Sequence, residues 1–436
     1  MTRTFDVAII GAGASGTLTA VQFARVAGPD AHGALIEAGA RAARGLAYGT
    51  PYGAHLLNVP AARMSALPDD PEHFLRWLRE RDPGAQASTF APRSLYGDYL
   101  ATLLGDAEVA SRVERVGGTA VGLSRSDAHW IVHLHDDRKI VARNVVLGLG
   151  NLPPSDPLHL ENAPDEYVSD PWAPGAAVGL DPDAPVLLIG TGLTAVDVAV
   201  ALRHEGHRGP LYALSRNGRL PHPHASFTPH PLAEMPEAFS SPRGALQWAR
   251  AAVSGGEDWR AVIDSIRPFT SAIWRQWTPH QRGSFYRHAK NLWDVHRHRA
   301  APEVRSELDV TVLRGRVAEM RAHERGVEVR YRPTGTNETA TLVVARVINC
   351  TGPASDYARV DLPLVVQMRR AGWLTPDPLR MGVETDADGR LIGHDGAPVE
   401  GLFTLGPLRR PALWESTAIP EIREQAAALA KVLAKS

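Results

Sequence analysis

The chain has 436 residues, 44% hydrophobic and 22% charged, which is enough for two or three domains with a sizeable core. Its 47 basic and 48 acidic residues leave a formal charge of -1, so bulk charge gives no reason to expect nucleic acid or an anionic membrane as a partner. No apolar run reaches the roughly 18 residues of a membrane helix, the N-terminus lacks a signal-peptide layout, and the single cysteine, Cys350, excludes an intramolecular disulfide. We therefore expect a cytoplasmic enzyme.

The first predicted element is a buried parallel strand over residues 5–10, followed by glycines at the G-x-G-x-x-G spacing. Such glycines permit a tight turn, a close approach to a pyrophosphate and tight packing of the next helix, whose free N–H groups face the phosphates. A second strand ends at Glu37, where a carboxylate accepts hydrogen bonds from an adenosine ribose. This βαβ unit predicts a bound dinucleotide, and a turn that serves only packing is the alternative. The predicted contacts are Gly11, Gly13, Ala14, Ser15, Gly16 and Glu37.

Residues from about 40 to 100 are irregular and rich in glycine and proline, and the alternating pattern from about 108 to 150 predicts antiparallel strands. Apolar residues in "LLNVPAARM" are expected to pack against a cofactor ring, with ordinary core packing as the alternative. The predicted cofactor contacts in this loop are Tyr48, Leu57, Asn58, Val59 and Met64.

A second glycine turn opens at residue 186, with Gly190, Gly192 and then Ala195 at the third position. The strand after it ends in Ser215-Arg216 instead of an acid. A hydroxyl and a guanidinium bind a 2′-phosphate, whereas a carboxylate would repel it, so this turn predicts NADPH over NADH. The alternative is that Arg216 is a solvated surface charge. The predicted contacts are Gly190, Gly192, Thr194, Ser215 and Arg216, with Arg219 as a further candidate.

Residues 220–305 are first rich in proline and histidine and then helical, and we expect them to cover the substrate. Their aromatic residues have a loosely helical spacing, which is also typical of plain core. In "HRHR", Arg297 or His298 is expected to hold an anionic substrate or the nicotinamide phosphates, with a solvated basic turn as the alternative. Three histidines in a proline-stiffened loop raise a zinc hypothesis, but they lack ligand spacing and a cysteine partner, so no metal is predicted. The aromatic residues are Trp274, Trp277, Phe285, Tyr286 and Trp293, and the histidines are His222, His224 and His230.

Strand-like alternation returns in "GVEVRYRP" and "LVVARVINCTGP", and a helix is predicted from Pro420 onward. Two turns of different specificity imply a resident dinucleotide and a diffusible one. The consistent pairing is FAD in the first and NADPH in the second, arranged for hydride transfer.

With these motifs the chain resembles the two-dinucleotide-binding flavoprotein superfamily, which includes glutathione reductase and the class B flavin monooxygenases. "VVLGLGN" (Gly150) and "VINCTGP" (Gly352) are similar to its paired linking strands. "LFTLGPLRR" is similar to its late FAD motif, although Pro407 follows Gly406 where that motif has aspartate. "WESTAIPEIREQA", including Thr417, resembles the final segment, whose helix start faces the flavin.

More narrowly, "LAYGTPYGAHLLNVPAARMSALPDDPEHFLRWL" and "WDVHRHRAAPEV" resemble a bacterial group of FAD/NAD(P)-binding proteins related to flavin N-hydroxylases. The resemblance implies an α/β fold with two Rossmann-like domains, each of three layers (ββα), and the NADPH domain inserted into the FAD domain. The expected boundaries are 1–154 and 306–436 for the FAD domain, 155–220 for the NADPH domain and 221–305 for the helical cover.

A disulfide reductase is excluded because it needs a cysteine pair, and the FxGxxxHxxxW signature of Baeyer–Villiger enzymes is missing. The leading hypothesis is an FAD- and NADPH-dependent monooxygenase that hydroxylates a small polar metabolite with O2 through a flavin C4a-hydroperoxide. Its predicted catalytic residues are Asn58, as a neutral hydrogen-bond donor, and Arg297. The alternatives are a reductase that passes electrons to another acceptor and a non-catalytic cofactor-binding protein, and a homodimer remains open.

Overall fold

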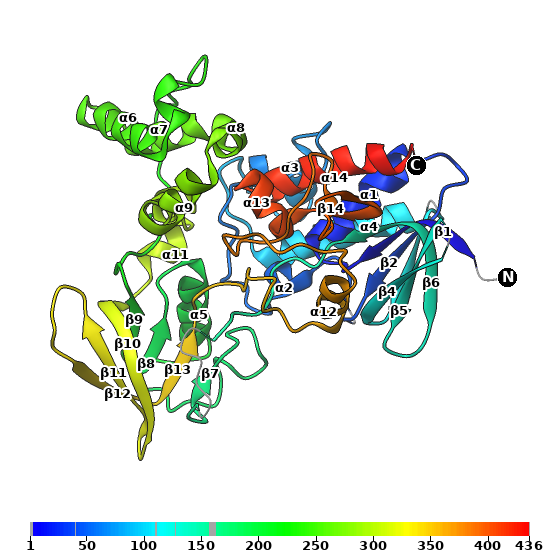
Figure 1. The fold of residues 1–436 in the computed structure, drawn as a ribbon. Coiled ribbons are helices and arrows are strands. Elements are labelled where there is room, and N and C mark those ends of the chain that lie inside the picture. The colour runs from blue at the N-terminus through cyan, green and yellow to red at the C-terminus, as the bar shows by residue number, and fades with distance from the viewer. Residues whose placement is uncertain (1–2, 40, 110, 127, 157–162, 436) are drawn as a thin grey trace.

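A computed structural model describes the chain except residues 1–2, 40, 110, 127, 157–162 and 436. Two sheets divide it into two α/β domains (Figure 1). The first sheet runs β14-β15-β6-β1-β2-β3, and β4 and β5 form an antiparallel extension from β6. Its strands are β1 (Thr4–Ile10), β2 (Gly33–Glu37), β3 (Val113–Gly117), β4 (Ala120–Ser126), β5 (His129–Leu134), β6 (Lys139–Leu147), β14 (Arg390–Ile392) and β15 (Pro398–Thr404).

The first sheet is covered on both faces, which explains the unbroken apolar run of β1. Val7 and Ile9 point into a core shared with three helices, whereas Ala8 and Ile10 point into a core shared with β4, β5 and a fourth helix. These layers are the predicted ββα arrangement. The three helices are α1 (Ala14–Val26), α4 (Arg93–Val109) and α14 (Ile419–Leu433), and the fourth is α12 (Pro363–Arg370). Shorter helices are α2 (Gly45–Tyr48), α3 (His73–Arg79) and α13 (Arg410–Leu413).

The second sheet repeats this plan in the order β12-β11-β10-β9-β8-β13-β7. Leu188 points toward the helix that follows the second glycine turn, and Leu187 points toward the antiparallel strands β10–β12. The elements are β7 (Tyr167–Val168), β8 (Val186–Ile189), α5 (Leu193–His204), β9 (Leu211–Ser215), β10 (Thr311–His323), β11 (Gly326–Pro333), β12 (Ala340–Val344) and β13 (Arg346–Asn349).

Pairing in the second sheet moves one predicted boundary. β10 is parallel to β9, and β13 is parallel to β8, so residues 311–349 belong to the second domain. The chain therefore returns to the first domain only after Asn349, and the expected return at residue 306 is wrong. Local alternation indicates strands in this stretch but says nothing about which sheet they join.

Two further expectations need correction. The stretch from 40 to 100, expected to be irregular, contains α3 and the start of α4. Within 108–150, β3 is parallel to β2, whereas β4, β5 and β6 pair antiparallel as predicted. The predicted C-terminal helix is confirmed as α14, with Pro420 in its first turn, where a missing N–H costs nothing.

The helical insertion leaves the second domain after β9 and returns to it at β10. In Figure 1 it extends beyond the second sheet and reaches α13, which belongs to the first domain. Its helices are α6 (Pro242–Ser254), α7 (Trp259–Ile266), α8 (Thr270–Gln276), α9 (Pro279–His288), α10 (Lys290–Arg297) and α11 (Pro302–Ser306).

Candidate functional site

The first glycine turn has no room for side chains. Gly11 has a φ of 98°, and a Cβ there would lie 2.6 Å from the carbonyl oxygen of Gly148 at the end of β6. A Cβ on Gly16 would lie 1.8 Å from the carbonyl oxygen of Gly11. Gly13 is the N-cap of α1, and no side chain among the described residues caps this helix. Ala14 and Ser15 form its first turn, so their end of α1 can receive a phosphate.

A cavity of about 420 Å³ opens between the ends of β2 and β3. The Glu37 carboxylate borders it and accepts hydrogen bonds from the backbone N–H groups of Ala12 (2.9 Å) and Gly39 (2.8 Å). A carboxylate has about four acceptor positions, so Glu37 keeps capacity for ribose hydroxyls. The other lining residues are Leu35, Gly39, Ala42, Val113, Arg115, Val116 and Gly117.

The late glycine motif closes on the first turn. Gly406 has a φ of 73°, and its missing Cβ would lie 2.6 Å from the Ser15 hydroxyl oxygen. Its N–H donates to the side-chain oxygen of Gln425 (3.0 Å) on α14, so backbone geometry is kept although Pro407 replaces the usual aspartate. The hydroxyl of Ser416 is buried without a hydrogen-bond partner among the described residues, and Thr417 is exposed next to it.

These three features form the fit test for FAD. The glycines of the first turn and Gly406 leave space that a Cβ would otherwise fill. A cavity of adenosine size is bordered by Glu37, and the Ser416 hydroxyl is buried without a hydrogen-bond partner among the described residues. The first domain therefore fits the cofactor. Sequence analysis quoted the segment that contains Ser416 and Gln425 but singled out only Thr417 from it, because the local pattern does not show which of its side chains are buried.

The second turn has the same construction. Gly190 has a φ of 125°, and a Cβ there would lie 2.3 Å from the carbonyl oxygen of Cys350, just after β13. Gly192 is the exposed N-cap of α5, and a Cβ there would meet nothing within 4 Å. Thr194 is half-buried in the first turn of α5.

At the end of β9 the hydroxyl of Ser215 shares a hydrogen bond with the Thr191 hydroxyl (2.9 Å) and accepts one from the Gly218 N–H (3.1 Å). Ser215 thus ties the second turn to the loop after β9. Arg216 and Arg219 are both exposed on that loop. The loop therefore presents two cations at the position where the first domain has Glu37.

The linkers between the domains lie side by side. Gly150 (φ 66°) and Gly352 (φ 89°) occupy matching places after β6 and β13, and neither would clash with an added Cβ. An isolated antiparallel bridge joins Leu152 to Ala354. The two segments that resemble linking strands are thus paired.

The loop of residues 55–65 is partly core. Leu57 and Met64 are 3% and 2% exposed and belong to the cluster around α1 and α14, so the core alternative holds for their side chains. Val59 packs on the edge of the same cluster. Asn58 is half-buried, and its carbonyl oxygen accepts a hydrogen bond from Nε2 of His224 (3.0 Å) in the insertion.

Tyr48 stacks at a tilt on Tyr96, with ring centroids 4.8 Å apart. Burial raises the pKa of Tyr48, so its phenol remains protonated. Tyr48 can therefore hydrogen-bond to a ligand only through a neutral hydroxyl.

A buried ion pair joins the two domains. The Arg93 guanidinium, at the start of α4, donates to both carboxylate oxygens of Asp197 on α5 (2.7 and 2.9 Å). Nε2 of His55 donates to the Asp197 carbonyl oxygen (2.8 Å), and its Nδ1 lies 2.8 Å from the Thr50 hydroxyl. This arrangement fixes the helix of the second turn against the first domain. Sequence analysis missed it because the partners are 104 residues apart.

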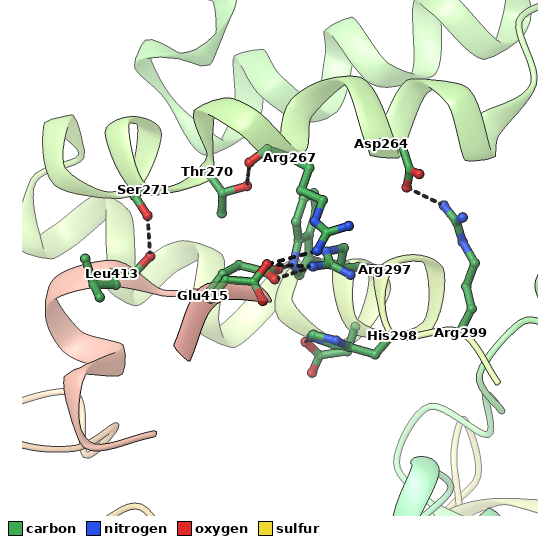
Figure 2. Close-up of polar contacts among 12 residues, drawn as sticks. Asp264, Arg267, Thr270, Ser271, Arg297, His298, Arg299, Leu413 and Glu415 are labelled. Atoms are coloured by element: carbon green, nitrogen blue, oxygen red, sulfur yellow. Dashed lines mark hydrogen bonds and ion pairs between the residues drawn. The ribbon is translucent and has the colours of Figure 1, made fainter. Parts of the chain in front are cut away.

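The insertion grips the segment before α14 (Figure 2). The Ser271 hydroxyl donates to the Leu413 carbonyl oxygen (3.2 Å), and the Trp274 indole donates to that of Pro411 (2.7 Å). Trp414 has a φ of 62° and lies against Trp274 with ring centroids 4.8 Å apart. The insertion thereby connects the second domain to the proposed flavin-facing end of the first.

Arg297 is committed to carboxylates rather than to a ligand. It binds Glu415 at 2.8 Å and lies 3.5 Å from Glu421, which also binds Arg267 at 3.0 Å. Burial alone would raise the pKa of Glu415, but the charge of Arg297 and a hydrogen bond from the Trp293 indole outweigh it and lower the pKa. Arg267 and Arg297 thus pair with Glu421 and Glu415, which corrects the expectation that Arg297 is free to hold an anion. Figure 2 shows Arg297 reaching Glu415, with Arg267 beside it.

His298 does not replace Arg297 as a cation for an anionic ligand. Its pKa is lowered chiefly by burial, and also by Arg297, against the opposing charge of Glu415. The imidazole is therefore neutral at physiological pH.

The aromatic residues of the insertion form a core, as the alternative had it. Trp274, Trp277 and Phe285 are buried together with Trp414, and Tyr286 and Trp293 pack at their edge. Two of the three histidines of the zinc hypothesis make separate contacts: His222 faces Trp259 and His296, and His224 binds Asn58. His230 lies 3.5 Å from Glu257. Within the described residues no group of three or more His, Cys, Asp or Glu side chains could hold a metal.

With this geometry in place, the chain can be compared with known proteins. Residues 8–152 match the family model described as FAD-NAD(P)-binding. Among relatives, uncharacterized proteins of Mycobacterium tuberculosis and Mycobacterium bovis are 22% identical, over 99% of this chain and 96% of theirs.

Solved structures share the whole fold. An ornithine N-hydroxylase of Kutzneria sp. 744 matches with a TM-score of 0.63 and 14% identity, and an L-lysine 6-monooxygenase of Pseudomonas syringae with 0.60 and 16%, each covering 99% of both chains. A thioredoxin reductase of Lactococcus lactis matches with 0.56 and 14%, covering 99% of this chain and 98% of its own. The predicted α/β fold with two Rossmann-like domains is confirmed. No helix among the described residues is long and apolar enough to span a membrane.

Proposed function

We propose that the chain is an FAD-dependent monooxygenase that takes its electrons from NADPH. The observation that carries the proposal is the pair of glycine turns. The strand after the first turn ends at the acid Glu37, and the strand after the second is followed by the cations Arg216 and Arg219. We assign FAD to the first sheet and its helices, NADPH to residues 167–215 and 311–349, and substrate cover to the insertion. A tightly bound flavin and a nicotinamide that exchanges with solution need these two different binding sites.

The choice of NADPH is tested by removing the cations. A 2′-phosphate would make charge-assisted hydrogen bonds with Arg216 and Arg219, each worth about 1.5–3 kcal/mol. We expect Arg216→Ala with Arg219→Ala to raise KM for NADPH at least about tenfold and to leave KM for NADH unchanged. Arg208→Ala, at an exposed site in the same domain, is the control. Equal KM values for NADPH in the double variant and the parent protein would refute this seat.

Disulfide exchange is excluded because this chain has no second cysteine, and the hydroxylase and monooxygenase among the structural neighbours favour oxygen as the electron acceptor. Cys350 is the only cysteine, it is 2% exposed, and burial raises its pKa. Bound flavin, once reduced, supplies two-electron chemistry toward O2, in which one oxygen atom enters the substrate and the other leaves as water. The insertion would keep water out by covering the segment between Trp414 and α14.

Asn58 and Arg297 take different roles in this proposal. Asn58 is the candidate hydrogen-bond donor near the flavin, held in place through its carbonyl by His224. Arg297 acts as a positioning residue, because its contact is Glu415, next to the buried Ser416. Leu57 and Met64 shape the loop from the core side.

The structural neighbours are named for N-hydroxylation of ornithine and oxygenation of lysine, so small metabolites are the proposed substrate range. The decisive experiment measures NADPH oxidation and O2 uptake together by the purified flavoprotein. Matched consumption with little hydrogen peroxide, in the presence of a stimulating metabolite, is the expected result. Turnover without oxygen, using an added electron acceptor, would instead indicate a reductase.

A further inference from the structure

A cavity of about 560 Å³ lies inside the helical insertion, bounded by α6, α7, α8, α9 and α10. This volume is in the usual range for a small-molecule site. Figure 1 shows α6 and α7 at the outer end of the insertion, away from both sheets. The α6–α7 end of the cavity therefore lies away from both sheets, while Trp414, in the segment before α14, lines another part of it.

The cavity wall is apolar and incompletely filled. Leu246 and Ala249 of α6 and Ile263 of α7 line it, and no residue of α6 is fully buried. Ala249 packs on the edge of the aromatic core of the insertion, whereas Leu246 does not belong to that core and lacks a core partner among the described residues. An apolar ligand would supply that partner.

One end of the cavity reaches the proposed flavin side of the molecule. Trp414 and Trp293 belong to its wall, and the Trp293 indole donates to Glu415 (3.1 Å). Glu415 precedes Ser416 and Thr417, which start the segment leading into α14. A molecule in the cavity thus contacts the side chains that hold this segment.

The charges around the cavity favour an anion. Among the described residues that line it there is no Asp or Glu, and Arg250, exposed on α6, is the only arginine or lysine. Residues 242–299 contain ten arginine and lysine residues against four acidic ones, although the whole chain carries a formal charge of -1. An ammonium group would meet no carboxylate in the lining itself, since Glu415 lies behind Trp293, whereas a carboxylate would find Arg250.

We propose that this cavity is the substrate pocket and that it takes an apolar, preferably aromatic, molecule with one carboxylate. That the bound molecule is a substrate rests on the proposed function, whereas the binding site itself is inferred from the geometry of the cavity. The bound molecule differs from the small polar metabolite that the sequence suggested, because the wall offers mainly hydrocarbon surface.

The test uses the holoenzyme and three probes of one shape: 3-phenylpropionate, 3-phenylpropan-1-ol and 3-phenylpropylamine. Isothermal titration calorimetry should give the tightest binding for the carboxylate and the weakest for the amine. Ala249→Trp fills the cavity from a helix with no fully buried residue, and it should weaken 3-phenylpropionate at least tenfold. Arg250→Ala should weaken the carboxylate about tenfold and leave the alcohol unchanged.

Arg243→Ala is the matched control, because Arg243 is an exposed arginine on the same helix that does not line the cavity. It should change none of the three affinities. On the same samples, 3-phenylpropionate should also change the rate of NADPH oxidation, and the change should be lost in Ala249→Trp.

Several outcomes would overturn the proposal. These are no binding of 3-phenylpropionate, amine binding as tight as carboxylate binding, binding that Ala249→Trp does not weaken, or, where NADPH does bleach the flavin, binding without any effect on NADPH oxidation. Dissociation of an oligomer by Ala249→Trp would show that a second copy of the chain covers the cavity instead. Failure of NADPH to bleach the flavin, with probe binding intact, would count against the proposed function and support the ligand site.

Discussion

At the scale of single residues, the two glycines of the second turn differ in what limits them. Gly190 is limited by its own protein, since its φ is positive and the Cys350 carbonyl blocks a Cβ. Gly192 has an extended backbone (φ −84°) and open space around it. Nothing in the described part of the chain requires Gly192 to lack a side chain, whereas the close approach of a ligand's pyrophosphate would.

This difference predicts opposite effects of two identical substitutions. Gly190→Ala should destabilise the protein by about 2–5 kcal/mol, because it combines backbone strain with overpacking. Gly192→Ala should leave the free energy of unfolding within about 1 kcal/mol of the parent value and raise KM for NADPH. Urea unfolding and steady-state kinetics on both variants provide the measurement. Unchanged NADPH kinetics in Gly192→Ala would show that NADPH does not bind at this turn.

Cys350 gives a second prediction at this scale. The thiol is buried, and burial raises its pKa, so the reactive thiolate is scarce and shielded. Ellman's reagent at pH 8 should label no thiol in the native protein and one per chain in denaturant. Rapid labelling without denaturant would mean that the second domain opens at β13.

At the scale of elements, α5 combines a proposed ligand site with a contact to the first domain. Its N-terminus is the proposed NADPH phosphate site, and its Asp197 is clamped by Arg93 from the first domain. The side chains of this pair are only 15% and 9% exposed, so removing one partner leaves a charge with little water.

Breaking this pair should be costly. Arg93→Met is expected to lower the free energy of unfolding by about 3–5 kcal/mol, and Arg93→Met with Asp197→Leu should recover part of the loss. Arg208→Ala breaks the exposed pair with Asp183, 67% exposed on both sides, and should cost about 0.5 kcal/mol or less. Denaturant titration compares the three. A single variant as stable as its exposed control would contradict the clamp.

At the scale of the whole molecule, the insertion bridges the two domains. It belongs to the second sheet by connectivity, between β9 and β10, but it binds Pro411, Leu413 and Glu415 of the first domain. Histidines with lowered pKa values are spread over all three parts. The pKa is lowered chiefly by burial in His55, His207, His222, His224 and His298.

These histidines predict how stability depends on pH. Each stays neutral in the folded state at a pH where the unfolded chain already binds a proton, so stability falls as pH drops below about 6.5. We expect Tm to decrease from pH 7.5 to pH 5.5. His207 has both ring nitrogens buried without a partner among the described residues, so His207→Leu should flatten this dependence.

The control for this prediction is His230→Gln, because His230 is an exposed histidine, and it should leave the slope unchanged. Calorimetric scans at five pH values between 5.5 and 7.5 would measure the effect. A Tm that rises toward pH 5.5 would show that protonated histidines are stabilised in the folded state.

The sequence by itself determined the two dinucleotide turns, the α/β class and the helical insertion. Glycine spacing, strand hydrophobicity and helix caps act over a few residues, so neighbours in the chain carry the information. Glu37 and the two arginines after β9 follow from the same local frame.

Only the tertiary structure decided which sheet residues 311–349 join, that Arg297 pairs with Glu415, that Arg93 clamps Asp197, and that a cavity exists under α6. Each of these depends on residues far apart in the chain, or on how completely side chains fill a space. Packing and charge pairing across such distances are set by the folded chain as a whole, and no local pattern encodes them.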